Sequence, residues 1–361
     1  MTGELVTWLD AQNIDYTIVD REVVNIPDFG RLFVADLSGV GSIFRGEGDT
    51  LTFNLLESPE VLMEEGIFHV AFPFGRNWYY YDLREAFRFN ILKYIGCPKP
   101  PKHDIPFVNL GIHTPYELLN ASGSLETWCR KAQWLGHTAA GIADRNTMAA
   151  TLNIQKECSK AGLKHIFGYT LTMQHEEERV EVKVYALTDE GLHNLLRIQR
   201  AVMVDSERHV LAYGRLLACA AGCVLVFATC SVYWMTAHPG HLKRIRQGFE
   251  AVYYQVDGSE YKADRIDRER LLALQHYFEK CYDAATDSFT VEPILISDCY
   301  YPDRDDAVSK TVLNKIASGA AHEQSDDQYF KNVDEHYDTL RPLFSAKWDF
   351  DALFSRMCGH T

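Results

Sequence analysis

The pattern of hydrophobic and polar positions divides this chain near residue 100. Before that point, helical spacing of apolar residues predicts helices at "ELVTWLDAQ", "SPEVLMEEG" and "REAFRFNILKYIG". Short runs rich in β-branched and aromatic residues predict strands at "YTIVD", "RLFVADL", "LTFNLL", "HVAFPF" and "NWYYYDL". Residues 1–96 are therefore expected to form a small α+β domain.

A proline-rich segment, "CPKPPKHDIP", follows this domain at residues 97–106. Proline lacks a backbone N–H and restricts the residue before it, so neither a helix nor a central strand continues through such a run. The segment is predicted to be a linker between two domains.

After the linker, predicted strands and helices alternate. Strands are expected at "FVNLGIH", "AAGIAD", "KHIFGYTLTM", "VEVKVYALT", "VLVFAT", "EAVYYQV" and "EPILISDC". Amphipathic helices lie between most of them, among them "SLETWCRKAQWLG", "EGLHNLLRIQRAVM" and "RIDRERLLALQHYFEKC". Repeated βα units with nearly continuous apolar strands predict an α/β fold with a parallel sheet closed into a barrel over residues 107–320, followed by a helical tail over residues 321–361.

Composition and charge indicate the class of protein and argue against one kind of function. The chain has 361 residues, 47% hydrophobic and 24% charged, which is typical of a globular protein. Its formal charge of -14 argues against a surface that binds DNA through its phosphates. The basic residues Lys243, Arg244 and Arg246 are interpreted as a solvated helix face.

The cysteines and the chain start indicate a cytoplasmic protein. Nine cysteines without a CxxC pair do not suggest a disulfide framework, and "MTGELVTWLD" lacks the basic end and apolar run of a signal peptide. Residues 216–237 carry no charge and are long enough to span a bilayer. They are rich in small residues, however, so a helix followed by a buried strand is expected there, with no membrane partner.

Chemistry in such barrels lies at the carboxyl ends of the strands. The residues at the predicted strand ends are Gly111, His113, Asp144, Arg145, Thr170, Glu181, Cys230, Asp298 and Tyr300. They mix metal-ligand types with residues that do not bind metals.

The chain from Phe107 to about Leu353 resembles the PHP (polymerase and histidinol phosphatase) domain of the bacterial DNA polymerase III α subunit. The resemblance rests on "GIHTPYELLNASGSLETWCRKAQWLG", "AAGIADRNTMAA", "CSKAGLKHIFGYTL", "VYALTDEGLHNLLRI", "VLVFATCS" and "ILISDCYYPDRDDAVSKTVLNKIASG", in the order and at spacings similar to that family. It implies a distorted (β/α)7-like barrel, with residues 321–361 leading toward a polymerase core that this chain does not contain.

Metal-binding members of that family hold divalent ions at the strand ends for phosphoester hydrolysis. The resemblance implies that this chain keeps four ligand positions, His113, Asp144, Cys230 and Asp298, and has changed five others, Gly111, Arg145, Thr170, Glu181 and Tyr300. A guanidinium stays protonated, so Arg145 is expected to pair with Asp144 where the family has a metal. We therefore expect no cofactor, or Zn or Mn if the site is active.

Three other groups have simpler interpretations. Cys230 is expected to be a buried small hydrophobic residue. The pair His238 and His241 in "HPGH" lacks further ligands at usable sequence spacing, and Asp349 and Asp351 in "DFD" are expected to open a helix.

The leading hypothesis is a degenerate PHP module of a DNA polymerase III α-like protein, with a structural or partner-docking role in DNA replication. Its partners would be a polymerase core or other replisome proteins, with DNA contacted only indirectly. The alternative is an active metal-dependent phosphoesterase or 3′-5′ exonuclease that uses His113, Asp144 and Asp298 with substitutes such as Glu181 or His175. A third hypothesis places the function in residues 1–96, as a binding domain.

Overall fold

A computed structural model gives the fold of the chain. It describes residues 101–260, 268–318 and 327–361, together with Asp10 and the backbone of six strands within residues 17–82. Two compact units are distinguished, Met1–Pro100 with Arg130–Gly136 and Pro101–Cys129 with His137–Thr361.

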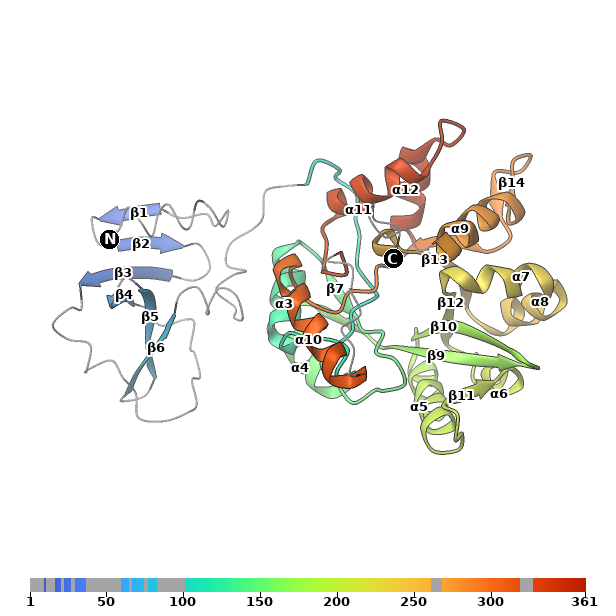
Figure 1. The fold of residues 1–361 in the computed structure, drawn as a ribbon, viewed down its shortest axis with the longest axis horizontal. Coiled ribbons are helices and arrows are strands. Elements are labelled where there is room, and N and C mark those ends of the chain that lie inside the picture. The colour runs from blue at the N-terminus through green and yellow to red at the C-terminus, as the bar shows by residue number, and fades with distance from the viewer. Residues whose placement is uncertain are drawn as a thin grey trace. The chain divides into compact units, whose positions relative to one another are not determined.

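The first unit contains a six-stranded sheet in the order β1-β2-β3-β4-β5-β6 (Figure 1). Neighbouring strands are antiparallel except for the parallel pair β3 and β4. The strands are β1 (Thr17–Asp20), β2 (Val23–Ile26), β3 (Gly30–Asp36), β4 (Glu60–Glu64), β5 (Ile67–Phe74) and β6 (Asn77–Asp82).

One helix prediction in this unit is wrong. The segment "SPEVLMEEG" contains β4, which pairs with β3 on one side and β5 on the other. Its apolar run is too short for periodicity to distinguish a helix from a strand, and the pairing with two neighbours decides the outcome. The predicted strand at "LTFNLL", the helix at "REAFRFNILKYIG" and all of the first helix except Asp10 lie outside the described residues.

The second unit is built around a six-stranded sheet in the order β11-β9-β10-β12-β13-β16. The strands of this unit are β7 (Ala139–Gly141), β8 (Lys164–Ile166), β9 (Gly168–His175), β10 (Glu178–Ala186), β11 (Val210–Ala212), β12 (Cys223–Phe227), β13 (Ala251–Val256), β14 (Tyr282–Asp283), β15 (Ser288–Phe289) and β16 (Glu292–Leu295).

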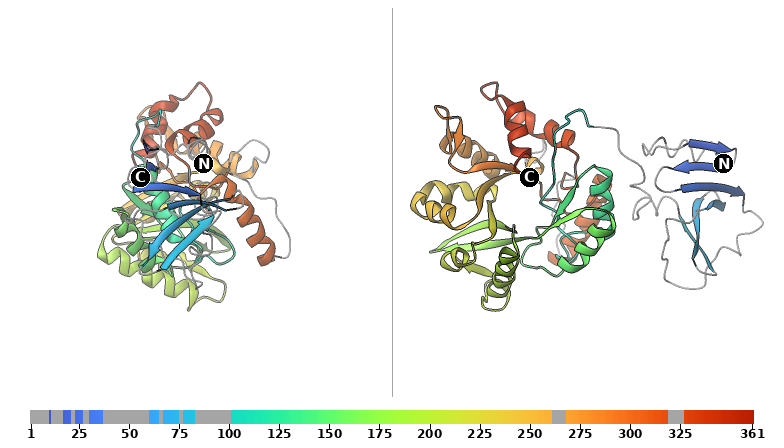
Figure 2. Two further views of the ribbon diagram at one scale, coloured as in Figure 1. Left: turned by 90° about the vertical axis from the view of Figure 1, so that its left-hand side faces the viewer. Right: turned by 180° about the vertical axis from the view of Figure 1, so that it is seen from behind.

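Helices lie along the outside of this sheet, as the right-hand view in Figure 2 shows. They are α4 (Thr151–Lys160), α5 (Asp189–Met203), α6 (Tyr213–Ala218), α7 (Val232–Ala237), α8 (Pro239–Gly248), α9 (Arg268–Lys280), α10 (Ala307–Ser318), α11 (Val333–Leu340) and α12 (Phe350–Cys358). A further helix, α3 (Leu125–Trp134), has its first half in this unit and its second half in the first unit. The α/β alternation expected for this part of the chain is confirmed.

The sheet is mixed, whereas a parallel sheet was predicted. β10 is antiparallel to both β9 and β12, while β12, β13 and β16 run parallel to one another. β9 and β10 form a hairpin whose turn places Glu176 at a φ of 51°. Only two residues separate these strands, which leaves no room for the helix that a parallel connection needs.

Single backbone bridges extend the pairing beyond the named strands. Ile112 bridges in parallel to Ile142 on one side and to Cys299 on the other, and Arg145 bridges to Thr170. The predicted strand at "FVNLGIH" is thus reduced to one bridged residue. β7 pairs with β8, and the single bridges link the segment after β7 to Thr170 of β9 and the segment after β16 to Ile112.

A large hydrophobic core fills the second unit between the sheet and its helices. Residues from β9, β10, β12, α5 and α9 contribute to it, and so do Leu340 of α11 and Phe354 of α12. The predicted helical tail therefore packs onto the same core. Asp349 accepts a hydrogen bond from the backbone N–H of Ala352, and it caps α12 as the "DFD" interpretation expected.

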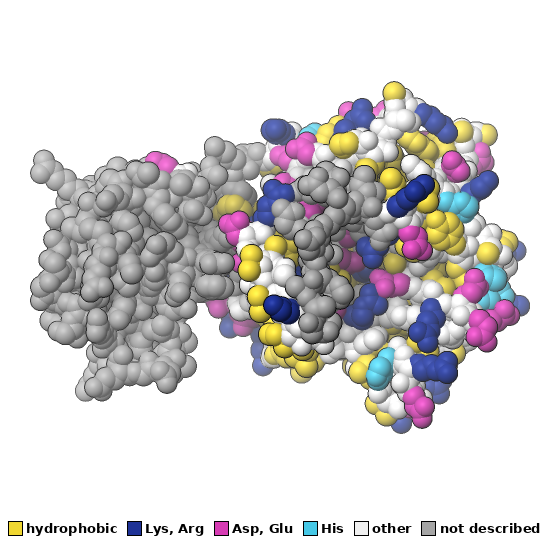
Figure 3. Space-filling view, viewed as in Figure 1, with side chains coloured by type: hydrophobic (Ala, Val, Ile, Leu, Met, Phe, Trp, Pro, Cys, Tyr) yellow, Lys and Arg dark blue, Asp and Glu magenta, His cyan; other side chains and the backbone are white. Residues whose placement is uncertain are grey.

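Charged side chains are spread over the face of the second unit that Figure 3 shows. The uncharged segment 216–237 contains the end of α6, then β12 and α7. Within the parts of the chain that the structure describes, no helix is long and apolar enough to cross a membrane.

Candidate functional site

His113 is the centre of a buried polar cluster. It follows the bridged residue Ile112 and is only 1% exposed. Its Nδ1 lies 2.6 Å from Oε2 of Glu117, and its Nε2 lies 3.1 Å from Oδ1 of Asp298. Both ring nitrogens are thus engaged by carboxylates, and the ring stacks on Tyr300 with centroids 4.3 Å apart.

Two carboxylates control the charge of His113. Burial disfavours the imidazolium, but Glu117 and Asp298 outweigh this effect and raise the pKa of His113 to about 9. Burial likewise opposes ionisation of Glu117, but its partner His113 and the backbone N–H of Arg145 lower the pKa of Glu117 to about 2. The pair is therefore an ion pair at neutral pH.

Asp298 binds a second cation. Its Oδ2 lies 3.0 Å from Nζ of Lys183, a side chain on β10 that is 0% exposed. Gln255 at the end of β13 donates to the same oxygen at 3.1 Å and accepts from Lys183 at 2.8 Å. Burial would raise the pKa of Asp298, but the charges of Lys183 and His113 hold it well below its usual range.

Asp144 and Arg145 do not pair, so the expected ion pair between them is wrong. The backbone N–H and the hydroxyl of Thr114 donate to the two oxygens of Asp144 at 2.5 and 2.6 Å. Arg145 instead lies 2.6 Å from Oε2 of Glu181 on β10. Adjacent residues on an extended backbone point to opposite sides, which separates the two side chains.

Asp144 is also the carboxyl in the cluster that ionises least readily. Burial raises the pKa of Asp144 to about 6, although the hydrogen bonds from Thr114 act in the opposite direction. Asp144 therefore releases its proton close to neutral pH.

Tyr300 and Lys310 cover His113 from one side. Nζ of Lys310 lies 3.1 Å from the centroid of the Tyr300 ring and donates to the side chain of Asn120 at 3.1 Å. Burial lowers the pKa of Lys310 to about 7. An aromatic ring thus stands between a buried ammonium group and the imidazole.

Gly111 is held by close packing. A Cβ atom built on it would lie 2.3 Å from the carbonyl oxygen of Ser297, which belongs to the neighbouring backbone segment. This backbone therefore has no room for a histidine at position 111. Thr170 donates its hydroxyl to the carbonyl of Ala143 at 2.6 Å, so it serves the backbone of the segment after β7.

Cys230 departs from its expected burial. It lies in a short 3-10 turn, Thr229–Ser231, directly after β12, and it is exposed. The prediction of a buried hydrophobic cysteine is wrong because the apolar strand ends three residues before it, at Phe227. The contacts described here for His113, Asp144 and Asp298 do not include it.

Comparison with known proteins adds the family. Residues 109–288 match the family model of the PHP domain. This part of the chain is a PHP domain. The resemblance read from the sequence is confirmed, and the chain is also similar to DNA polymerase III α subunits.

Two of these relatives show the extent of the match. The DNA polymerase III α subunit of Treponema pallidum is 25% identical over 64% of this chain and 21% of its own length. That of Staphylococcus epidermidis is 22% identical over 65% of this chain and 19% of its own length. The chain thus spans about a fifth of the length of these curated relatives.

The chain also has a weaker similarity to solved structures. One is a candidate metal-dependent phosphoesterase from Bifidobacterium adolescentis, 14% identical, with a TM-score of 0.35 over 69% of this chain and 99% of that chain. Another is an amidohydrolase from Chromobacterium violaceum, 9% identical, with a TM-score of 0.31 over 68% of this chain and 99% of that chain.

The sequence analysis missed several residues of the buried polar cluster around His113. Glu117 is four residues after His113, a spacing that could have suggested the contact. Lys183 could have been noticed as a charged residue within the apolar run "VEVKVYA". Gln255, Thr114 and Lys310 carry no sequence signal, because only the folded chain brings them to their partners Asp298, Asp144 and Asn120.

Among the described residues of the PHP domain, two groups of three side chains place potential metal-ligand atoms within 4.8 Å of one another. One is His113, Glu117 and Asp144, and the other is His175, Glu178 and His238. Only the first contains residues expected from the strand ends.

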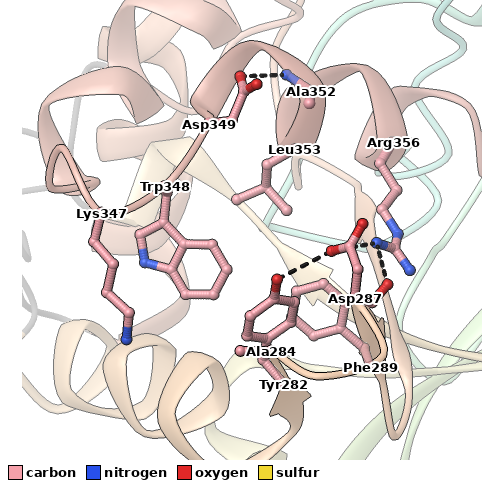
Figure 4. A pocket seen from close by; sticks show the side chains of 10 residues that line it. All are labelled: Tyr282, Ala284, Asp287, Phe289, Lys347, Trp348, Asp349, Ala352, Leu353 and Arg356. Carbon is pink, nitrogen blue, oxygen red and sulfur yellow. Dashed lines mark hydrogen bonds and ion pairs between the residues drawn. The ribbon is translucent and has the colours of Figure 1, made fainter.

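A separate pocket of about 540 Å³ lies between the β14–β15 hairpin and α12 (Figure 4). Its lining is aromatic and charged, comprising Tyr282, Ala284, Asp287, Phe289, Lys347, Trp348, Asp349, Ala352, Leu353 and Arg356. None of these residues belongs to the His113 cluster, so the pocket is not part of that site.

Proposed function

We propose that this PHP domain is a folded module without hydrolytic activity, with a structural or partner-docking role in DNA replication. Its partners would be a polymerase core or other replisome proteins, and it would contact DNA only through them. The observation that carries the proposal is the buried ion pair between Lys183 and Asp298.

The charge of Lys183 argues against a divalent ion on Asp298. The ammonium group is fully buried and lies 3.0 Å from the carboxylate oxygen. Unit charges about 4 Å apart repel by about 4 kcal/mol at an effective dielectric constant near 20, and a divalent cation doubles that cost. A metal at this carboxylate would therefore require Lys183 to leave or to lose its proton.

The other carboxylates of the cluster that could bind a metal already accept hydrogen bonds from the protein. Both oxygens of Asp144 accept from Thr114, and Glu117 accepts from His113, Asn120 and the backbone of Arg145. Gly111 cannot be replaced by a histidine without movement of the backbone at Ser297. These contacts support a site in which protein cations stand in place of metal ions.

The relationship to DNA polymerase III α subunits supports a place in replication. Those relatives are about five times longer than the matched segment, so their other domains offer surfaces for this one to bind. A PHP domain without hydrolytic activity would then contribute to replication by binding these other domains.

One observation favours the alternative of a metal-dependent phosphoesterase. The ligand atoms of His113, Glu117 and Asp144 lie within 4.8 Å of one another, close enough to share one ion. If a Zn or Mn ion bound there, it would supply Lewis-acid activation of a phosphoryl oxygen or of water.

The metal content of the purified full-length protein distinguishes the two functions. The wild type and Asp144→Asn, which keeps the shape of the side chain but removes its charge, are purified without chelators and measured by elemental mass spectrometry. We expect the two proteins to differ by less than about a tenth of an equivalent of Zn, Mn and Fe. A full equivalent that only the wild type retains, together with hydrolysis of 3′-labelled single-stranded DNA, would contradict the proposal.

A further inference from the structure

A second polar cluster lies at the far end of the β9–β10 hairpin. His175 is the last residue of β9, Glu178 is the first of β10, and His238 stands between the end of α7 and the start of α8. His175 and Glu178 are three residues apart in the hairpin, and the fold brings His238, 60 positions from Glu178, next to them beside Trp234 of α7.

The three side chains are close enough to share one ion. Nε2 of His238 lies 2.6 Å from Oε2 of Glu178, and Nδ1 of His175 lies 3.9 Å from the same oxygen. Their ligand atoms all fall within 4.8 Å of one another. His175 is buried, whereas Glu178 and His238 are accessible, so an ion could reach the group from solvent.

The nitrogen of His175 that faces this group carries a lone pair. The indole N–H of Trp234 donates to Nδ1 of His175 at 3.2 Å, so that nitrogen is an acceptor. A metal ion needs the same lone pair. Binding of a metal ion to Nδ1 would break the hydrogen bond from the indole of Trp234. The free energy lost with one such hydrogen bond is small compared with that of a metal–nitrogen bond.

A third imidazole adjoins the cluster. The ring of His241 lies 4.4 Å from that of His175, centroid to centroid, and 6.0 Å from that of His238. Its Nδ1 is buried and has no hydrogen-bond partner among the described residues. Buried polar atoms in proteins normally have a partner, and this one belongs to a ring that adjoins the other two imidazoles.

We propose that His175, Glu178 and His238 bind one Zn²⁺ or a similar late first-row cation, and that the adjacent His241 turns toward the ion as the fourth ligand. Imidazole nitrogens with one carboxylate are a ligand set that suits zinc, and four protein ligands are typical of a structural site. The ion would join the β9–β10 hairpin to the segment between α7 and α8. This site shares no residue with the His113 cluster and does not depend on the proposed function.

Cobalt titration of the full-length protein tests the site. The protein is stripped with a chelator, which is then removed, and Co²⁺ binding is followed by the visible absorption of tetrahedral cobalt. His238→Ala and Glu178→Gln change accessible side chains, so both variants are expected to fold. Controls are His193→Ala, an exposed histidine on α5, and Asp144→Asn in the other cluster.

We expect one equivalent of Co²⁺ to bind the wild type, His193→Ala and Asp144→Asn alike. Loss of one ligand in His238→Ala or Glu178→Gln should weaken binding at least about tenfold. Zn²⁺ should displace the cobalt and raise the thermal midpoint of the wild type, with a smaller rise in His238→Ala.

Two results would overturn the site. Absence of saturable Co²⁺ binding to the wild type is one, and equal binding by the wild type, His238→Ala and Glu178→Gln is the other. The outcomes also separate the two proposals. Binding lost only in Asp144→Asn would refute this site and the proposed function together, while binding lost only in the hairpin variants supports this site and leaves the His113 cluster without metal.

Discussion

Lys183 lies in the middle of β10 with its ammonium group between Gln255 and Asp298. A buried cation is costly unless it is paired and hydrogen-bonded, and this one has both kinds of partner. Its removal would leave the carboxylate of Asp298 with His113 as its only cationic partner among the contacts described for this cluster.

Lys183→Met should therefore lower the free energy of unfolding by about 3–5 kcal/mol, the range found when one partner of a buried ion pair is removed. Arg179→Met is the matched control, because Arg179 is on the same strand but exposed. Urea unfolding of the three proteins measures the difference. A cost below about 1 kcal/mol for Lys183→Met would show that Asp298 does not need this ammonium group.

The ion pair of His113 makes stability depend on pH. The folded-state pKa of His113 is raised from 6.5 to about 9, so its contribution is fully present below pH 6.5 and is lost as the pH rises through about 9. A shift of this size corresponds to about 3 kcal/mol. Glu117, the partner of His113 in this ion pair, adds a dependence at acid pH. Its folded-state pKa is lowered from 4.5 to about 2, so its contribution to stability is lost as the pH falls from 4.5 through about 2.

Denaturant unfolding of the wild type and His113→Gln between about pH 6 and pH 10 tests this dependence. The advantage of the wild type should shrink as the pH rises. Comparison with the variant cancels other titrations, such as that of Lys310, whose pKa burial lowers to about 7. A stability difference that stays constant across this range would contradict the charged state assigned to His113.

At the scale of elements, the segment around Gly111 is held between two backbones. Ile112 bridges to Ile142 and to Cys299, and this close approach leaves no space for a side chain at Gly111. A larger side chain at position 111 therefore requires the backbone at Ser297 to move, whichever residue is introduced.

Gly111→Ala should lower the free energy of unfolding by about 1–3 kcal/mol, because the new methyl group would overlap the carbonyl of Ser297. Gly214→Ala is the control. A Cβ on Gly214 meets no atom within 4 Å, and alanine favours the helix α6. Thermal unfolding of both variants measures the contrast, and equal midpoints would show that the segment relaxes without cost.

Secondary structure was predictable where an element is long and its pattern is local. The helices α5 and α9 and the strands β10 and β12 were expected from apolar periodicity, and the structure has them. The strand at β4 and the antiparallel direction of β10 were missed. Both depend on which neighbours a short apolar run pairs with, and this information is not local to the run.

At the scale of the whole molecule, the charge of -14 makes contact with DNA unfavourable. The basic residues Lys243, Arg244 and Arg246 are exposed on α8, which agrees with a solvated helix face. Three such residues amid this net charge would neutralise few phosphates.

We therefore expect no saturable binding of the full chain to duplex or primed DNA below about 100 µM at physiological salt. Fluorescence anisotropy of labelled DNA over a range of salt concentrations is the measurement. Micromolar affinity that falls steeply with salt would contradict this expectation, and loss of that affinity in Lys243→Ala with Arg244→Ala would then locate the surface on α8.

The sequence by itself determined the α/β class, the family and the residue types at the strand ends, because periodicity and short motifs are properties of neighbouring residues. Only the tertiary structure decided which charges pair. Arg145 and Glu181 are 36 positions apart, Lys183 and Asp298 are 115 apart, and Glu178 and His238 are 60 apart. Such partners are chosen by strand register and burial, since a buried charge must find a counter-charge wherever the packed backbone places one.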